Sequence, residues 1–228
     1  MKSEHKKWVE KNLSQNDLKK QIEDERYAEI IDYWFAKAKI DDWLLWTINV
    51  LYHGDITISG NSYYRLMELR NWLSSRIWSR LYPELDASFE NFGNVLRDFL
   101  SLFQRYSTCE SDGDQVRYEM VRFYRNAIGN PDQYQKSLSE YNLYKTLLVD
   151  LIFELTRAIN YILEKFRQHI DPLYRLDEGL VLVGDDPFEA PYAAEYKDNE
   201  RKLYPYPGIQ QFQYDRKTRD IHCVVPAG

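Results

Sequence analysis

Apolar residues recur at alternating three- and four-residue steps in the second half of the chain, which is its strongest helical signal. Asn130 can cap this element, and Pro131 suits its first helical position. Asp171 ends it, because a residue that precedes proline is pushed away from helical angles. We predict one long helix over about 131–170, around which the other elements pack. Its apolar face comprises Tyr141, Tyr144, Leu147, Leu148, Leu151, Ile152, Leu155, Ala158, Ile159, Ile162, Leu163 and Phe166.

Weaker helical patterns precede this element. Sparse apolar residues in a mostly charged stretch predict a first helix, and the pattern strengthens from Tyr27. Asp41 and Asp42 favour the start of another helix after a bend, since carboxylates stabilise a helix N-terminus. We interpret 56–58 as a connector or an isolated strand and 110–114 as a solvent loop. The predicted helices cover about 3–24 with a continuation to about 40, then 41–53, 62–82, 88–103 and 116–124, which with the long helix makes about five or six helices.

Helical periodicity disappears after Pro172, and six of the eight prolines lie from there onward. Residues 179–183 predict a short strand, with 221–225 as its candidate antiparallel partner. The segment is rich in tyrosine and phenylalanine, whereas a disordered tail is poor in aromatic residues. We therefore expect a packed, mostly irregular C-terminal extension that holds at most a small β-hairpin.

The predicted fold class is all-α, with a multi-helix bundle over 1–171 and an extension of the same domain over 172–228. The net charge of −6 disfavours a nucleic-acid partner. The two cysteines, Cys109 and Cys223, fit a reducing compartment. No segment is long and apolar enough to span a bilayer, and the charged N-terminus is not a secretory signal. We expect a cytoplasmic protein without a membrane partner.

Polar residues form a second stripe on the long helix, largely opposite its apolar face. Paired carboxylates inside a bundle could bind a metal or act as acid and base. However, the di-metal helical pattern needs Glu-x-x-His, and Glu164 and His169 have the wrong spacing. We interpret the stripe as a solvated or ion-paired face and expect neither metal nor cofactor. It consists of Asp150, Glu154, Arg157, Tyr161 and Glu164.

Two arginine-rich stretches are candidates for ligand or phosphate binding. Trp72, Arg76 and Arg80 are spaced by four, so a helix would place them on one face. Arg122 and Arg125 lie among aromatic residues and repeat the combination. Guanidinium groups beside aromatic rings suit phosphate contact and base stacking. We favour the alternative, in which the arginines pair with acids while their stems cover aromatic rings.

Arg216 and His222 are the candidate catalytic residues. The five residues between them give a spacing that resembles the Arg-x4–6-His motif of the HEPN helical ribonucleases. In that family the pair lies on or beside a helix of a bundle, and the histidine performs acid–base chemistry on the RNA ribose. Here we expect both residues in the extension, on a loop and a strand.

Charge is divided unevenly along the extension. Residues 171–200 hold nine acids against two bases, and 201–228 hold five bases against two acids. We expect the acidic half to lie on the arginine-bearing helices and the basic half to return to it. Recruitment of a partner is the alternative.

The preferred interpretation is a non-catalytic helical interaction or regulatory module of a bacterial-type cytoplasmic system, which binds another protein or its own copy. The first alternative is an RNA- or nucleotide-directed enzyme that uses the arginines and His222 in one open cleft. The second is a small-molecule or nucleotide sensor with a pocket between bundle and extension, lined by tyrosines and arginines.

Overall fold

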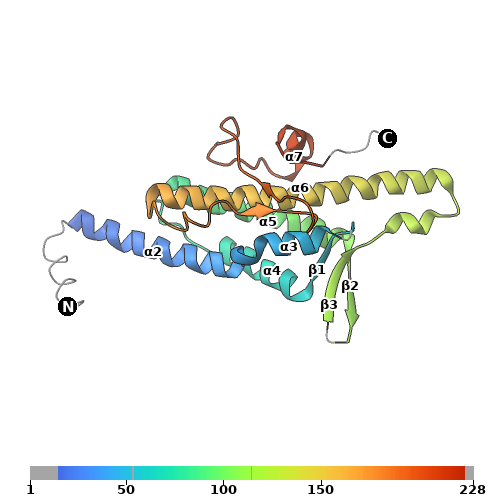
Figure 1. Ribbon diagram of the computed structural model, residues 1–228, viewed down its shortest axis with the longest axis horizontal. Helices are drawn as coiled ribbons and strands as arrows, with labels where there is room; N and C mark the ends of the chain where they lie inside the picture. Colours follow the sequence, from blue (N-terminus) through green and yellow to red (C-terminus); the bar gives the residue numbers. More distant parts are fainter. Residues whose placement is uncertain (1–14, 53, 114, 224–228) are drawn as a thin grey trace.

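The predicted long helix is the longest element of the computed structural model, which describes residues 15–52, 54–113 and 115–223. Helix α6 (Pro131–His169) begins at the expected capping signal, since the Asn130 side chain accepts a hydrogen bond from the Gln133 backbone N–H. It lies along α5 (Pro83–Tyr106) (Figure 1). Every residue from 151 to 163 is buried, so this stretch of α6 is enclosed on all sides.

Shorter helices complete the bundle: α2 (Gln15–Ala38), the 3-10 turn η1 (Ile40–Asp42), α3 (Trp43–Leu51) and α4 (Gly60–Ser74). The expected bend before Asp41 is made by Lys39, which has a left-handed backbone conformation. Trp43 ties α3 to α6, because its Nε1 donates to Thr156 Oγ1 at 2.9 Å. The all-α class built around one long helix is confirmed. Residues 3–14 of the predicted first helix lie outside the described residues.

A small antiparallel sheet replaces the helix predicted over 116–124, and that prediction is wrong. Strands β2 (Ser107–Asp112) and β3 (Gln115–Met120) form a hairpin, and β1 (Thr57–Ser59) pairs with the base of β3. Val116 and Met120 are four residues apart, a spacing that fits a helix and also one face of a strand. The hairpin also contains most of the stretch 110–114, which had been interpreted as a plain loop. It projects from the bundle (Figure 1).

Two helix boundaries also differ from the prediction. Helix α4 stops at Ser74 instead of continuing to residue 82, and the side chains of Ser74 and Ser75 hydrogen-bond to carbonyls of its last turn. Helix α5 begins at Pro83 rather than at Ser88, since proline is tolerated in the first turn, where its missing N–H has no helical partner. Ser88 is buried inside α5.

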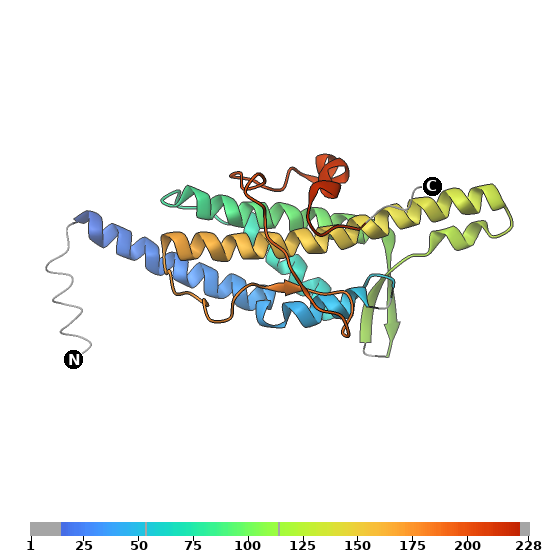
Figure 2. The same cartoon turned by 45° about the horizontal axis from the view of Figure 1, so that its top comes forward.

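The extension is mostly irregular, as expected, and it crosses α6 before returning over α5 and α6 (Figure 2). Strand 182–183 does not pair with the candidate partner 221–225, of which 224 and 225 lie outside the described residues. It pairs instead with a nearer strand, so the hairpin is local. The elements of the extension are β4 (Leu182–Val183), β5 (Tyr192–Ala193), α7 (Ile209–Asp215) and η3 (Arg216–Thr218).

Asn160 of α6 anchors this hairpin. Its Nδ2 donates to the carbonyls of Val181 and Ala194, and its Oδ1 accepts from the Val181 N–H, all at 2.8–2.9 Å. On α5, Asn91 does the same for the later part of the extension by bonding the Tyr196 hydroxyl and the Tyr206 N–H. These buried amides satisfy backbone groups that would otherwise lack partners. No helix in the described ranges is long and apolar enough to cross a membrane.

Leu155→Ala is expected to lower the free energy of unfolding by about 2–5 kcal/mol, because truncation leaves a cavity at a fully buried site. Chemical denaturation of the two proteins measures the difference. Leu143, on an exposed part of the same helix, is the matched control, and its replacement by alanine should cost far less. A loss below about 0.5 kcal/mol for Leu155→Ala would contradict its place in the core.

Candidate functional site

The candidate catalytic pair lies where the extension meets α6. Arg216 Nη1 is 2.6 Å from Asp150 Oδ2, and both side chains are only 2% exposed. Arg216 also donates to Thr146 Oγ1. His222 Nδ1 lies 3.0 Å from the Arg219 carbonyl oxygen. Arg216 is therefore committed to a buried ion pair, and its guanidinium does not face a cleft that a polymeric substrate could enter.

Further charged groups surround this pair and form a buried ion network. Arg219 contacts Glu154 at 3.2 Å and Glu200 at 2.6 Å. Arg157 lies 3.5 Å from Glu154 and 2.7 Å from Asp220. This face of α6 is ion-paired, as expected, but it is buried rather than solvated because the extension covers it. The members of the stripe that are buried are Asp150, Glu154, Arg157 and Tyr161.

Burial shifts the pKa values of the carboxyl groups in this network. Burial raises the pKa of Asp150, although the Cys223 N–H and Arg216 favour its charged form. Burial also raises the pKa of Glu154, against the charges of Arg219 and Arg157. Carboxylates in such surroundings stay charged only while their arginines remain in place. The packing of the extension on α6 therefore depends on the ion pairs between its arginines and the carboxylates of α6.

The direction of charge pairing differs from the expectation. The basic half of the extension lies on the acids of α6, and no ion pair among the described residues joins the acidic half to α4. The expected contact of the basic half with the acidic half is present at two points, between Arg219 and Glu200 and between Arg201 and Asp198. Ion pairs thus hold the extension, and most of the acids that its basic half meets belong to α6.

A second cluster, the Arg76 stack, lies where α4 ends and α5 begins. Five side chains follow one another in contact: Tyr33, Trp72, Arg76, Trp78 and Phe89. The Arg76 guanidinium carbon lies 4.3 Å from the Trp72 ring centroid and 6.0 Å from that of Trp78. Tyr33 stacks on Trp72 at 4.7 Å, and Trp78 stacks on Phe89 at 5.1 Å. The stack runs from the surface of α2 to the core face of α5.

Arg76 has no carboxylate partner and no side-chain hydrogen bond within the described part of the chain. Burial and the nearby charge of Arg26 lower its pKa. A guanidinium that lies over a ring still presents its N–H groups at its edge, where carboxylates and phosphates bind. The stack thus holds a charged group that the surrounding protein does not neutralise.

A hollow of about 270 Å³ adjoins Arg76 and is also lined by Ser74, Asn94, Glu90 and Arg97. Arg97 is paired with Asp98 at 3.1 Å, so its charge is already balanced. Ile77 follows Arg76 in the chain and is 86% exposed.

Of the five candidate binding residues, the structure brings Trp72 and Arg76 together and leaves the other three elsewhere. Arg80 lies beyond the end of α4 with a left-handed backbone, so the expected helical face does not include it. Arg122 bonds Asp55, which also accepts from the Tyr141 hydroxyl. Burial alone would raise the pKa of Asp55, but these hydrogen bonds outweigh it and lower the pKa.

Arg125 lies in the turn before α6 and lines an open hollow with Tyr124, Ile128 and Tyr134. This part of the chain projects beyond α5 at the end of the molecule opposite to the Arg76 stack (Figures 1 and 2). The arginines and His222 do not converge on one site. Sequence analysis missed Tyr33 and Trp78, whose contribution depends on where α4 ends. Comparisons with protein families, curated proteins and solved structures find no match to this chain.

Proposed function

We propose that the protein is a non-catalytic interaction module that binds an acidic segment of another protein on the Arg76 stack. One observation carries the proposal: in a chain with 36 acidic residues, Arg76 lies over two indole rings without a carboxylate partner among the described residues. A carboxylate of the partner would complete this arrangement.

The residue types in the Arg76 stack also favour a protein-binding surface. Tryptophan, tyrosine and arginine are enriched among the residues that contribute most to protein–protein affinity. The stack supplies all three, and the partly exposed Trp72 and Trp78 give an apolar surface beside the guanidinium. A hydrogen bond from a guanidinium to a carboxylate is worth about 1.5–3 kcal/mol, and the ring contacts hold Arg76 in place before binding. The preferred ligand is therefore a segment with a carboxylate next to an apolar side chain.

A protein partner is favoured over nucleic acid. Nucleic acid binding requires several cations that follow the phosphate backbone. Among the residues that line the hollow, Arg76 is the one cation without an ion pair to a described residue, because Arg97 pairs with Asp98. The buried, ion-paired state of Arg216 likewise favours binding over catalysis.

Arg76→Gln is expected to weaken binding of acidic peptides about tenfold or more, because it removes the charged hydrogen bond and keeps most of the side-chain volume. The probe is a panel of synthetic peptides in which glutamate stands next to leucine or tryptophan, each with a glutamine counterpart. Fluorescence anisotropy of labelled peptides gives the dissociation constants. Arg125→Gln, the same charge change at the far end of the molecule, is the control and should leave the affinity unchanged.

Equal binding of glutamate and glutamine peptides, or equal loss in both variants, would contradict the proposal. Self-association that disappears in Arg76→Gln would instead place a second copy of the chain on this surface. RNA cleavage by the purified protein that is lost in His222→Ala, with the fold intact, would favour the ribonuclease alternative.

A further inference from the structure

The connection between β4 and β5 presents an aromatic side chain among acids. We call residues 184–191 the Phe188 loop; they hold three acids and no base. Phe188 is 87% exposed, more than any other large apolar side chain in the described ranges. Its ring meets that of Tyr52 edge-on at 6.5 Å, a contact that leaves most of it uncovered. The three acids form no ion pair with a described residue: they are Asp185, Asp186 and Glu189.

Backbone contacts fix the Phe188 loop before any partner binds. The Phe188 N–H donates to Asp186 Oδ1 at 2.8 Å, which holds the turn. The Gly184 N–H donates to Thr47 Oγ1 of α3 at 3.1 Å. Gly184 lies so close to α3 that an added Cβ would be 3.1 Å from Leu44 Cδ1. A loop that is already ordered loses less conformational entropy on binding.

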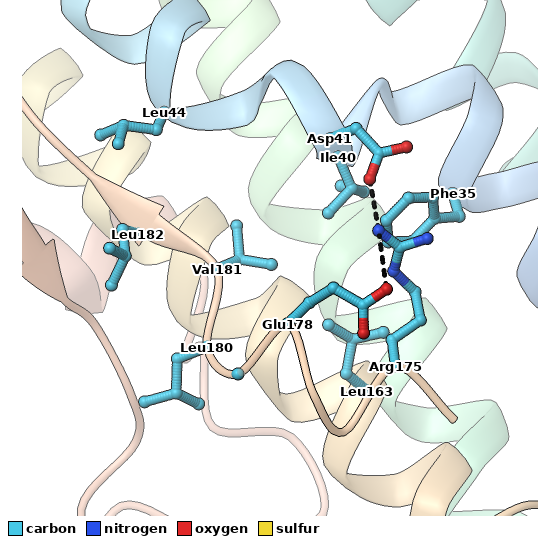
Figure 3. A pocket seen from close by; sticks show the side chains of 11 residues that line it. Phe35, Ile40, Asp41, Leu44, Leu163, Arg175, Glu178, Leu180, Val181 and Leu182 are labelled. Atoms are coloured by element: carbon cyan, nitrogen blue, oxygen red, sulfur yellow. Dashed lines mark hydrogen bonds and ion pairs between the residues drawn. The ribbon is translucent and has the colours of Figure 1, made fainter. Parts of the chain in front are cut away.

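The segment before the loop is also held on the bundle. It lines a hollow of about 290 Å³ together with η1 and α3 (Figure 3). Leu44 of α3 and Leu182 of β4 contribute to the apolar part of its wall, and Arg175 bridges Asp41 and Glu178. No described tyrosine lines this hollow, in contrast to the pocket expected between bundle and extension. These contacts fix the place of the β4–β5 hairpin and of the loop that it carries.

The Phe188 loop and the Arg76 stack lie on different sides of the bundle. Helix α4, at whose end the stack forms, packs against α2 and α5. Strand β4 packs against α3 and α6, and the extension crosses α6 (Figure 2). Both ends of the loop are tied into the β4–β5 pair, so a chain cannot place its own loop on its own stack while this pair stays formed. The expected contact between the acidic half of the extension and the arginine-bearing helices can therefore form only between two molecules.

We propose that the Phe188 loop of a second molecule of this chain binds the Arg76 stack. This inference rests on the proposed function and names the partner of that site. The Phe188 ring would enter the hollow beside Arg76, against Trp78 and Phe89. An apolar cavity of about 150 Å³ holds a benzene molecule, and the hollow has about 270 Å³. The adjacent Glu189 carboxylate would accept hydrogen bonds from the guanidinium of Arg76, which has no carboxylate partner in the described part of its own chain.

Local charge favours the Phe188 loop over the other exposed apolar–acid pairs of the extension. Residues 176–177 directly follow Arg175, whose charge opposes attraction to a second guanidinium. Residues 214–215 are followed by Lys217, and the Asp215 carboxylate already accepts from the Gln211 side chain. The Phe188 loop contains no base, so its carboxylates meet a cation of the partner without competition.

The contact would be heterologous, because the loop of one molecule meets the stack of the next. Each pair leaves one loop and one stack free, and contacts of this kind generate rings or open chains. A single loop buries little area, so the association is expected to be weak and to depend on concentration. Sedimentation velocity at protein concentrations up to about 1 mM detects association with a millimolar or tighter Kd. We expect the average mass to rise across this range.

Two variants each disable one side of the contact. Arg76→Gln removes the cation of the stack, and Phe188→Ala combined with Glu189→Gln removes the two side chains of the loop. Each is expected to self-associate about tenfold or more weakly than the unchanged chain. An equimolar mixture of the two should form dimers and nothing larger, because one variant keeps an intact loop and the other an intact stack. Leu176→Ala with Asp177→Asn, the same kind of change at another exposed pair, is the control and should associate as the unchanged chain does.

Three results would overturn the inference: a monomeric unchanged chain throughout the concentration range, undiminished association of either variant, or a mixture without dimers. Circular dichroism verifies that the variants fold, and both loop positions are exposed. A monomeric chain that still distinguishes glutamate from glutamine peptides would remove this inference and leave the proposed function in place. Equal binding of the two kinds of peptide would instead remove both.

Discussion

Removal of residues 172–228 is expected to yield an aggregated or partly unfolded protein. The deletion would expose the face of α6 that now carries buried charge, and it would leave Asp150 and Glu154 without Arg216 and Arg219. It would also remove buried apolar side chains that pack on the bundle core. These are Val183, Ala194, Tyr196, Tyr206 and Phe212.

The aromatic side chains alone make this effect large. Each buries on the order of 150–250 Å², and apolar burial contributes about 25 cal/mol per Å². The three buried rings, Tyr196, Tyr206 and Phe212, therefore contribute roughly 11–19 kcal/mol before ordering entropy is subtracted. That sum is comparable to the whole stability of a typical domain.

Size-exclusion chromatography and thermal unfolding of a chain that ends at Asp171 test this expectation. A chain that ends at Cys223 is the control, because it keeps every side chain of the extension that contacts α6 in the described structure. Limited proteolysis of the full chain gives an independent measure. Rapid removal of the extension that leaves a soluble, cooperatively folding 1–171 core would contradict the expectation and would make the extension a tail for partner binding.

The long helix could be predicted from sequence because its signal is both long and bounded. Its apolar residues keep one helical period from Tyr141 to Phe166, and Asn130 and Pro172 mark the ends of the 39-residue helix. The β2–β3 hairpin was missed because six residues are too few to separate the two periods. Met120 is four residues after Val116, but Tyr118 between them shares their face in the strand, and this alternation was the signal for β3.

At the two candidate sites, prediction from sequence was limited in a similar way. Sequence analysis selected Trp72 and Arg76 but placed them on one helical face with Arg80, whereas the stack forms because α4 ends and the chain turns back. Burial of the polar stripe on α6 depends on Arg216 and Arg219, which lie more than sixty residues away along the chain. Local periodicity carries no information about such a partner.

Arg216→Met is expected to lower the free energy of unfolding by about 3–5 kcal/mol, because it leaves the buried Asp150 carboxylate without its counter-charge. Asp150→Leu should cost a similar amount by leaving the guanidinium alone. The double variant replaces the pair by apolar groups of similar size, so it should lose much less than the sum of the two single changes. Urea denaturation of the four proteins gives the coupling energy.

The exposed pair Arg201–Glu164 provides the matched comparison. Its charged atoms are 3.1 Å apart, but its side chains are 39% and 34% exposed. Solvent screens such a pair, and its coupling energy should be only about 0.2–1 kcal/mol. The buried pair differs because neither charge can recover its hydration when the other is removed. We therefore expect the coupling energy of the Asp150–Arg216 pair to exceed that of the exposed pair by at least about 2 kcal/mol. Equal coupling energies for the two pairs would show that the packing of the extension on α6 does not depend on the Asp150–Arg216 ion pair.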